Sequence, residues 1–141
     1  MGRTVLRQYG PELWTVLGYK FANSQIGEEW MILEVALSSP GGQVAKVTRE
    51  NVFLRTPNGN RVPLPTQKEF NEAYGSLRPT IAKADVERDP LDYFPPNREP
   101  CDMRFFVTPG TGVSFDEVVM NDRRACFGRL FFSVSGGIQP G

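Results

Sequence analysis

The two cysteines are the side chains of this 141-residue chain that could most readily do chemistry. Cys101 and Cys126 each stand just before a run rich in phenylalanine, "RFF" and "RLFF". Such a pair can form a structural disulfide, remain as two unpaired core thiols, or act as a redox pair. The redox alternative is disfavoured because the two cysteines lack the CxxC spacing.

The chain contains no histidine, which removes the commonest general base and the commonest metal ligand. A Ser-His-Asp or Cys-His site therefore cannot be built within this chain, and two cysteines fall short of the four ligands of a structural zinc site. Sixteen basic residues balance sixteen acidic ones, so no net field would hold a nucleic acid. We expect no enzyme activity, no cofactor, no metal and no nucleic-acid partner.

The carboxylates leave two alternatives to that expectation. Six of them lie in or beside a proline-rich stretch, where oxygen-rich loops can hold calcium: Asp85, Glu87, Asp89, Asp92, Glu99 and Asp102. Basic residues are interleaved with them and their spacing matches no calcium loop, so a solvated mixed-charge surface is the preferred interpretation. Asp116, Glu117 and Asp122 could serve as the acid and base of sugar hydrolysis, but the sequence fixes no separation between them.

Aromatic rings offer a third kind of site, because they supply contact area for a sugar or a peptide with little loss of entropy. Tyr93, Phe94 and Trp14 are the candidate ligand-binding residues, with Tyr19 as a further member of the same platform. The alternative for Trp14 and Tyr19 is a place in the core of a strand. For Tyr93 and Phe94 the alternative is to fix a long loop to the domain.

These residues must be positioned mainly by short strands, since 12 prolines and 14 glycines make the chain rich in turns. The residue pattern predicts strands at 3–8, 13–21, 30–38, 43–47, 51–55, 61–65, 103–108, 114–120 and 127–134. The run "WMILEVALS" is expected to be the central strand, although a buried helix fits the same pattern. Asn58 and Gly59 are expected to supply the positive-φ residues of a hairpin turn.

One helix is expected between the early and the late strands. Thr66 and Glu69 have the form of a capping box, and apolar residues at helical spacing follow it. These apolar residues are Phe70, Ala73, Tyr74 and Leu77. Pro79 is expected to end or kink the helix near Arg78, with another turn or two after it, and four prolines then predict a long loop over 88–100.

The order of these elements predicts an all-β fold with one inserted helix. A chain of this length suits a single domain, 1–141, in which about seven or eight of these short strands pack as an antiparallel β-sandwich. The helix and the proline-rich loop form an insertion at about 66–100.

Two motifs resemble those of a group of uncharacterised bacterial immunoglobulin-like domains of exported proteins and lipoproteins, akin to secreted mycobacterial antigens. The first is "F-L-x-x-x-x-G" with a hairpin, at Phe53, Leu54 and Gly59; the second is "G-x-L-x-F-x-V", at Gly128, Leu130, Phe132 and Val134. The resemblance covers about residues 12–136 and implies an immunoglobulin-like sandwich in an exported setting. It implies no activity, since a shared sandwich does not carry a shared chemistry. The long insertion and the end of the chain at "GGIQPG" depart from the pattern.

An exported setting favours a Cys101–Cys126 disulfide, because the two residues are expected at the same end of neighbouring strands. The sequence has no run of about 18 apolar residues, so no membrane span is predicted. Its N-terminus does not have the pattern of a signal peptide. Either the protein is cytoplasmic, or it is a mature segment whose export signal was removed, in which case a lipid anchor is also possible.

We therefore expect a non-enzymatic extracytoplasmic interaction domain, periplasmic, secreted or lipoprotein-anchored, whose partner is an unknown protein or glycan. The alternatives are a carbohydrate-binding module and a structural subunit that assembles through an edge strand or the inserted helix.

Overall fold

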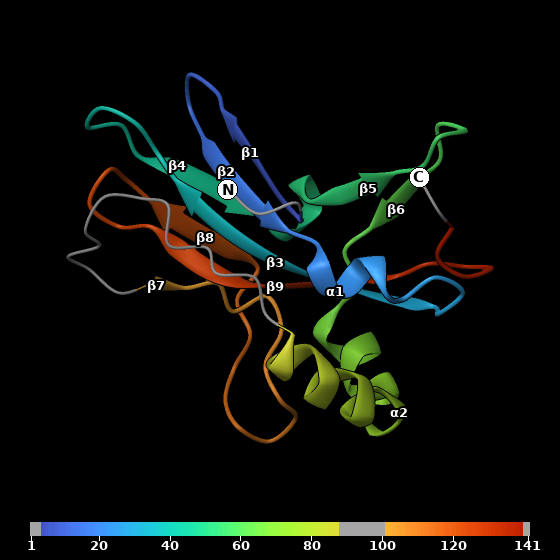
Figure 1. Ribbon diagram of the computed structural model, residues 1–141. Helices are drawn as coiled ribbons and strands as arrows, with labels where there is room; N and C mark the ends of the chain where they lie inside the picture. Colours follow the sequence, from blue (N-terminus) through green and yellow to red (C-terminus); the bar gives the residue numbers. More distant parts are fainter. Residues whose placement is uncertain (1–3, 88–100, 140–141) are drawn as a thin grey trace.

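The computed structural model describes residues 4–87 and 101–139, and over this part the fold is mostly β with one long helix (Figure 1). The strands are β1 Val5–Tyr9, β2 Trp14–Gly18, β3 Trp30–Ser38, β4 Ala45–Thr48, β5 Phe53–Arg55, β6 Arg61–Pro63, β7 Cys101–Asp102, β8 Glu117–Met120 and β9 Cys126–Ser133. The helices are α1 Lys20–Asn23, the 3-10 turn η1 Arg49–Asn51, and α2 Gln67–Val86. The mostly β class with an inserted helix, expected from the sequence, is confirmed.

A five-stranded sheet forms the centre of the domain, in the order β1-β2-β3-β9-β7. Its middle strand is β3, which spans the run "WMILEVALS" as predicted and pairs with β2 on one side and with β9 on the other. β7 runs parallel to β9, whereas the other neighbours in the sheet are antiparallel. The sheet is therefore mixed, and the expectation of a wholly antiparallel arrangement is wrong at this edge.

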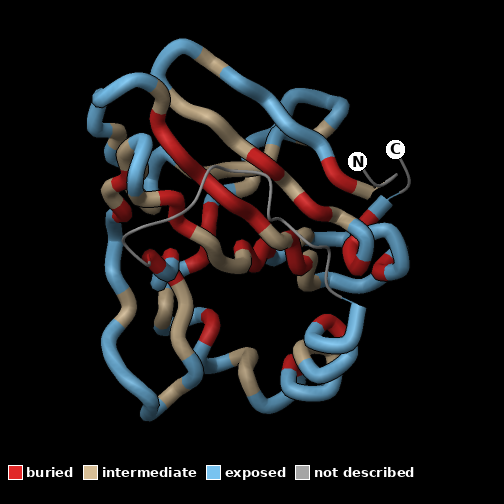
Figure 2. Tube along the Cα trace, turned by 60° about the vertical axis from the view of Figure 1, so that its left-hand side comes forward, coloured by how far each residue is buried: buried red, intermediate tan, exposed pale blue. Residues whose placement is uncertain are grey.

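The two faces of this sheet carry separate hydrophobic clusters, because successive side chains of a strand point to opposite sides. One face, called here the groove face, presents residues of β3 and β9 that include Leu33, Val35 and Phe132. The opposite face, called the helix face, presents Ile32 and Phe131. Figure 2 shows the buried residues gathered in the central strands and the exposed residues on the outer loops.

The groove face is partly covered by two small sheets, the pair β4–β8 and the hairpin β5–β6. Val118 and Met120 of β8 and Leu54 and Val62 of the hairpin pack into the cluster on this face. In the hairpin turn Gly59 has a positive φ, as predicted. Among the described residues only glycines have a positive φ, so the prediction that Asn58 has one is wrong. The strand β6 contacts β9, and Leu54 of β5 lines a cavity together with Leu6 of β1 and Leu17 of β2, so β5 is the hairpin strand on the side of β2 and β1.

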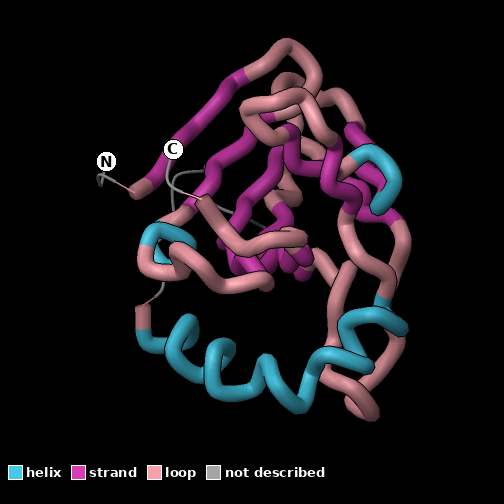
Figure 3. The backbone as a smooth tube through the Cα atoms, turned by 90° about the vertical axis from the view of Figure 1, so that its right-hand side faces the viewer, coloured by secondary structure: helices cyan, strands magenta, loops and turns pink. Residues whose placement is uncertain are grey.

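The helix α2 lies along one side of the strands and packs against the helix face (Figure 3). Thr66 and Glu69 form the predicted capping box, and Phe70 and Leu77 are buried as the stripe predicts. The helix does not end at Arg78 but continues through Pro79 to Val86. The continuation is possible because Pro79 and Gly75 both lie on the exposed side of the helix, so water can hydrate the Gly75 carbonyl, whose usual N–H partner proline does not have.

Two other expected elements differ from the structure. Residues 103–108 are not a strand, because the strand that pairs with β9 is the preceding dipeptide of β7. The N–H of Met103 still donates to the carbonyl of Phe127 at 2.8 Å, and the chain leaves the sheet edge after this residue. Residues 20–23 form the short helix α1 rather than the end of a strand. The proline-rich loop expected at 88–100 lies outside the described residues.

Within 4–87 and 101–139, none of the helices combines the length and the apolar character needed to cross a bilayer.

Candidate functional site

The two cysteines form a disulfide, as the sequence predicts. Cys101 of β7 and Cys126 of β9 are register partners on neighbouring parallel strands, with 4.6 Å between their Cα atoms. Both residues are buried, and Cys126 belongs to the cluster on the groove face. The pair therefore fixes a two-residue edge strand to the central sheet and has the environment of a structural bond.

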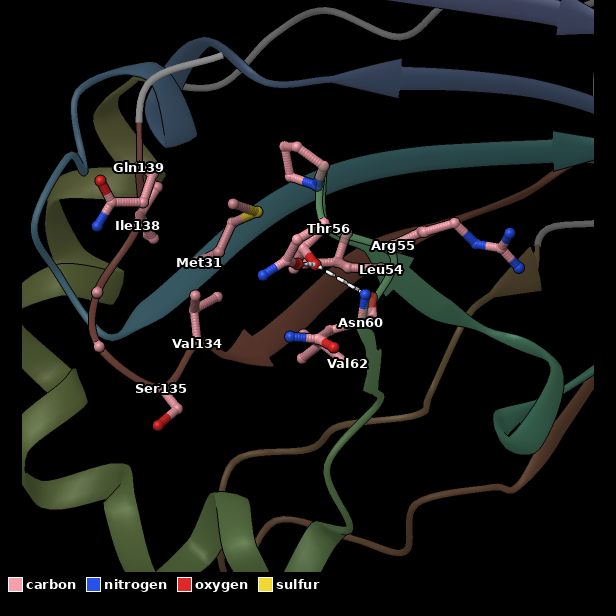
Figure 4. A pocket seen from close by; sticks show the side chains of 14 residues that line it. Met31, Leu54, Arg55, Thr56, Asn60, Val62, Val134, Ser135, Ile138 and Gln139 are labelled. Atoms are coloured by element: carbon pink, nitrogen blue, oxygen red, sulfur yellow. Dashed lines mark hydrogen bonds between the residues drawn. The ribbon is translucent and has the colours of Figure 1, made fainter.

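An open cavity of about 570 Å³ lies between the hairpin β5–β6 and the segment that follows β9 (Figure 4). Its apolar wall includes Met31 from β3, Leu54 and Val62 from the hairpin, and Val134 and Ile138 from the C-terminal segment. The volume is in the range of small-ligand sites. We call this space the first cavity.

A second cavity of about 610 Å³ continues from the first, because both are lined by Met31, Leu54 and Ile138. It extends over the groove face of β1 and β2, where Leu6 is 58% exposed, and reaches Ile26 after α1, which is 51% exposed. The two cavities together are called the groove. Exposed aliphatic side chains that converge on one hollow typically mark a binding surface.

Uncharged groups line the groove. Among the described residues of its wall, Arg55 is the one charged residue, and Figure 4 shows its side chain directed away from Met31 and Ile138. Asn60 and Thr56 form the polar rim at the hairpin turn, where the amide N–H of Asn60 donates to the Thr56 hydroxyl at 3.0 Å. The groove therefore suits an apolar ligand with few charges.

The wall of the second cavity depends on Gln25, a fully buried polar residue. Its side-chain amide donates to the carbonyl of Trp30 at 2.7 Å, and its amide oxygen accepts from the N–H of Ile32 at 2.9 Å. These bonds continue the pairing of β3 beyond the point where β2 ends, and they hold the turn before β3 in place. Ile26, the next residue, is thereby positioned at the groove.

The aromatic residues proposed from the sequence do not gather in the groove. Trp14 stacks on Tyr9 with 4.9 Å between ring centroids. By strand alternation Trp14 lies on the face of β2 that carries Val16, opposite to Leu17. Tyr19 does line the second cavity. Tyr93 and Phe94 lie outside the described residues, so their proposed role stays a prediction.

Three of the candidate carboxylates in the described part form ion pairs, each with a different partner. Asp116 binds Arg49 at 3.0 Å, and Glu117 binds Lys46 at 3.3 Å. Asp85 of α2 binds Arg129 of β9 at 2.8 Å. Over 4–87 and 101–139, no group of three or more acidic or cysteine side chains is arranged to hold a metal ion.

Arg129 also binds Glu34, its register partner on β3, at 2.7 Å. Its Nη2 atom is buried and has no hydrogen-bond partner in the described structure, beside a cavity of about 230 Å³ under α2. Phe70 and Phe131 also line this small cavity. The arrangement joins α2 to the sheet through charge, and the aromatic rings around it belong to the core.

Sequence reasoning did not find the groove, because its wall is assembled from separate parts of the chain. Leu6, Ile26, Leu54 and Ile138 are distant in sequence, and each alone is an ordinary aliphatic residue. One local feature could have indicated it: the polar connection at residues 23–29, "NSQIGEE", contains a single aliphatic residue, Ile26.

Comparison of the chain with protein-family models, curated proteins and solved structures finds no match. The fold and the site define a mostly β domain with a mixed sheet, a buried disulfide and a groove lined mainly by uncharged groups. Its function has to be inferred from that geometry.

Proposed function

We propose that this protein is a non-enzymatic binding domain and that its ligand occupies the groove between the central sheet and the hairpin β5–β6. The observation that supports this most directly is the groove itself, a continuous apolar hollow with exposed Leu6 and Ile26 at one end. Side chains that could serve as nucleophile, acid or base do not converge on its described wall.

We further propose that the domain works outside the cytoplasm. The support is the buried Cys101–Cys126 disulfide, since structural disulfides persist chiefly in oxidising compartments. The relation to bacterial immunoglobulin-like domains is part of the same proposal and rests on the sequence motifs. In this proposal the two small sheets, β4–β8 and β5–β6, together correspond to the second sheet of the immunoglobulin-like sandwich.

The test is binding of N-phenyl-1-naphthylamine, an uncharged dye that fluoresces in apolar sites. We expect saturable fluorescence with the wild-type protein and at least a severalfold weaker affinity in Ile26→Asp, because a carboxylate in the groove would be desolvated by the bound dye. Ile26 is half exposed, so this change should leave the fold intact.

The matched control is Val113→Asp, which introduces the same charge at a residue that is 72% exposed and lies away from the groove. Equal dye binding by the two variants, or none by the wild-type protein, would contradict the proposed site.

A further inference from the structure

We propose that the occupant of the groove is an extended peptide segment of a partner protein, which pairs with the free edge of β5 and covers the groove face of β1 and β2. This inference rests on the proposed function and names the class of ligand. It predicts a peptide that is apolar at alternate positions and uncharged on its inward side.

In the described structure β5 has a free edge, because it pairs with β6 alone. The Thr56 N–H donates to Asn60, and since bonded pairs alternate along an antiparallel ladder, Leu54 and Val62 form the next bonded pair. The N–H and C=O groups of Phe53 and Arg55 therefore point away from β6. They offer the pattern that an added strand requires.

The free edge of β5 faces β2 and β1. The hairpin packs on the groove face with β6 in contact with β9, and Leu54 of β5 lines the second cavity together with Leu6 and Leu17. The groove-face residues next in line are Leu17, which is partly buried, and Leu6, which is 58% exposed. A strand added to β5 would lie above these two residues and would continue the second layer.

The cavity below that strand is mainly apolar over the wall that the structure describes. Leu6, Leu17, Leu33 and Leu54 contribute aliphatic surface to the second cavity, and its described wall carries no charged residue. Successive side chains of the added strand would point alternately into this cavity and into solvent. Apolar residues at every second position would fill it, whereas an inward charge would lose its hydration without a partner.

The experiment begins with selection of random peptides, displayed on phage, against the full chain with its disulfide intact. We expect enriched sequences with apolar residues at alternate positions. The selected peptide is then synthesised and titrated into isotope-labelled protein, with chemical shifts and amide exchange as the readout. Protection of the Phe53 and Arg55 amides from exchange is expected, since each would donate to the peptide.

Two matched controls separate edge pairing from apolar contact. A copy of the peptide that is N-methylated at every second residue, on the side facing β5, keeps its side chains but loses the donors. We expect it to bind roughly tenfold or more weakly, since several backbone hydrogen bonds are lost together. Leu6→Asp should weaken binding of the unmodified peptide, while Val113→Asp should not.

Several outcomes would overturn the inference. These are a selection that enriches no sequence, enrichment at helical spacing, full affinity of the methylated peptide, or unchanged exchange at Phe53 and Arg55. The dye experiment stands apart from them: dye binding that is sensitive to Ile26→Asp, together with failure of every peptide, would leave the groove as a ligand site and reject the peptide as its occupant.

Discussion

At Gly128 the strand β9 and the chain leaving β7 pass close to each other. A Cβ atom at this position would lie 2.8 Å from the Cβ of Met103 and 2.9 Å from its carbonyl oxygen. Because the second of these atoms belongs to the backbone, rotation of a side chain cannot relieve the contact. Gly128→Ala should therefore lower the free energy of unfolding by about 1–3 kcal/mol, measured by urea denaturation.

The control is Gly75→Ala in the exposed part of α2, where an added Cβ meets nothing within 4 Å. Here the smaller backbone entropy of alanine should raise the free energy of unfolding by about 0.5–1 kcal/mol. Opposite signs for the two variants are expected; a Gly128→Ala protein as stable as wild type would show that Met103 does not cross β9 so closely.

The disulfide gives a second prediction at the residue scale. Intact mass after alkylation should show no modified thiol before reduction and two after it, since Cys101 and Cys126 are the only cysteines. Replacing both by alanine should lower the free energy of unfolding by roughly 3 kcal/mol, because the bond restricts the conformations open to the unfolded chain. Labelling of both thiols without reduction would remove the main support for an extracytoplasmic site.

Residue-level prediction succeeds where the signal is local and fails where it is not. The capping box of Thr66 and Glu69 is a short-range pattern, and it occurs as predicted. The burial of Gln25 has no such signal, because its two partners lie on β3, and its neighbours in sequence are those of a polar loop.

At the scale of elements, α2 shows that tertiary contacts can outweigh a local breaker. Pro79 should interrupt a helix, yet the turns on both sides of it are anchored, by Phe70 and Leu77 before it and by Ala84 and Asp85 after it. The same reasoning explains residues 103–108, which are of types that favour strands. Phe105 and Phe106 pack in the core, and the segment does not join a sheet.

Pro79→Ala should therefore stabilise the protein. Proline inside a helix costs about 3 kcal/mol relative to alanine, and about 1 kcal/mol of this is offset because proline also restricts the unfolded chain. A gain of about 1–2 kcal/mol in the free energy of unfolding is expected from urea denaturation. Arg78→Ala, also exposed on α2, should change stability by less than about 0.5 kcal/mol; no gain in Pro79→Ala would mean that the helix is already broken there.

For the whole molecule, the sequence predicts the class of fold and the length of the central strand but not how the layers meet. Among the residues that the structure describes, the hairpin β5–β6 covers only part of the groove face and leaves Leu6 and Leu17 without a second layer, which is why the groove exists. Neither Leu6 nor Leu17 predicts this uncovered part of the groove face by itself. It depends on where the hairpin β5–β6 packs, and the hairpin is distant from both residues in sequence.

Through its side chain, Arg49 joins the segments that precede α2, follow β7 and precede β8. It follows β4, its side chain is 11% exposed, and it donates to the carbonyls of Pro65, before α2, and Phe105, after β7. It also pairs with Asp116, before β8, and its guanidinium lies 5.0 Å from the ring centroid of Phe106. One residue thus connects three segments that are distant in sequence.

Arg49→Met keeps most of the side-chain volume but leaves the carbonyls of Pro65 and Phe105 without their donor. Each buried acceptor left unsatisfied costs about 1–3 kcal/mol, so the two carbonyls together predict a loss of about 2–6 kcal/mol in the free energy of unfolding. Asp116→Asn removes only the charge of a carboxylate that is 88% exposed, and it should cost less than about 1 kcal/mol. The free energies of unfolding of the two variants are measured by urea denaturation. Equal losses would mean that Arg49 stabilises the protein through its surface ion pair with Asp116 and not through its buried hydrogen bonds to the backbone.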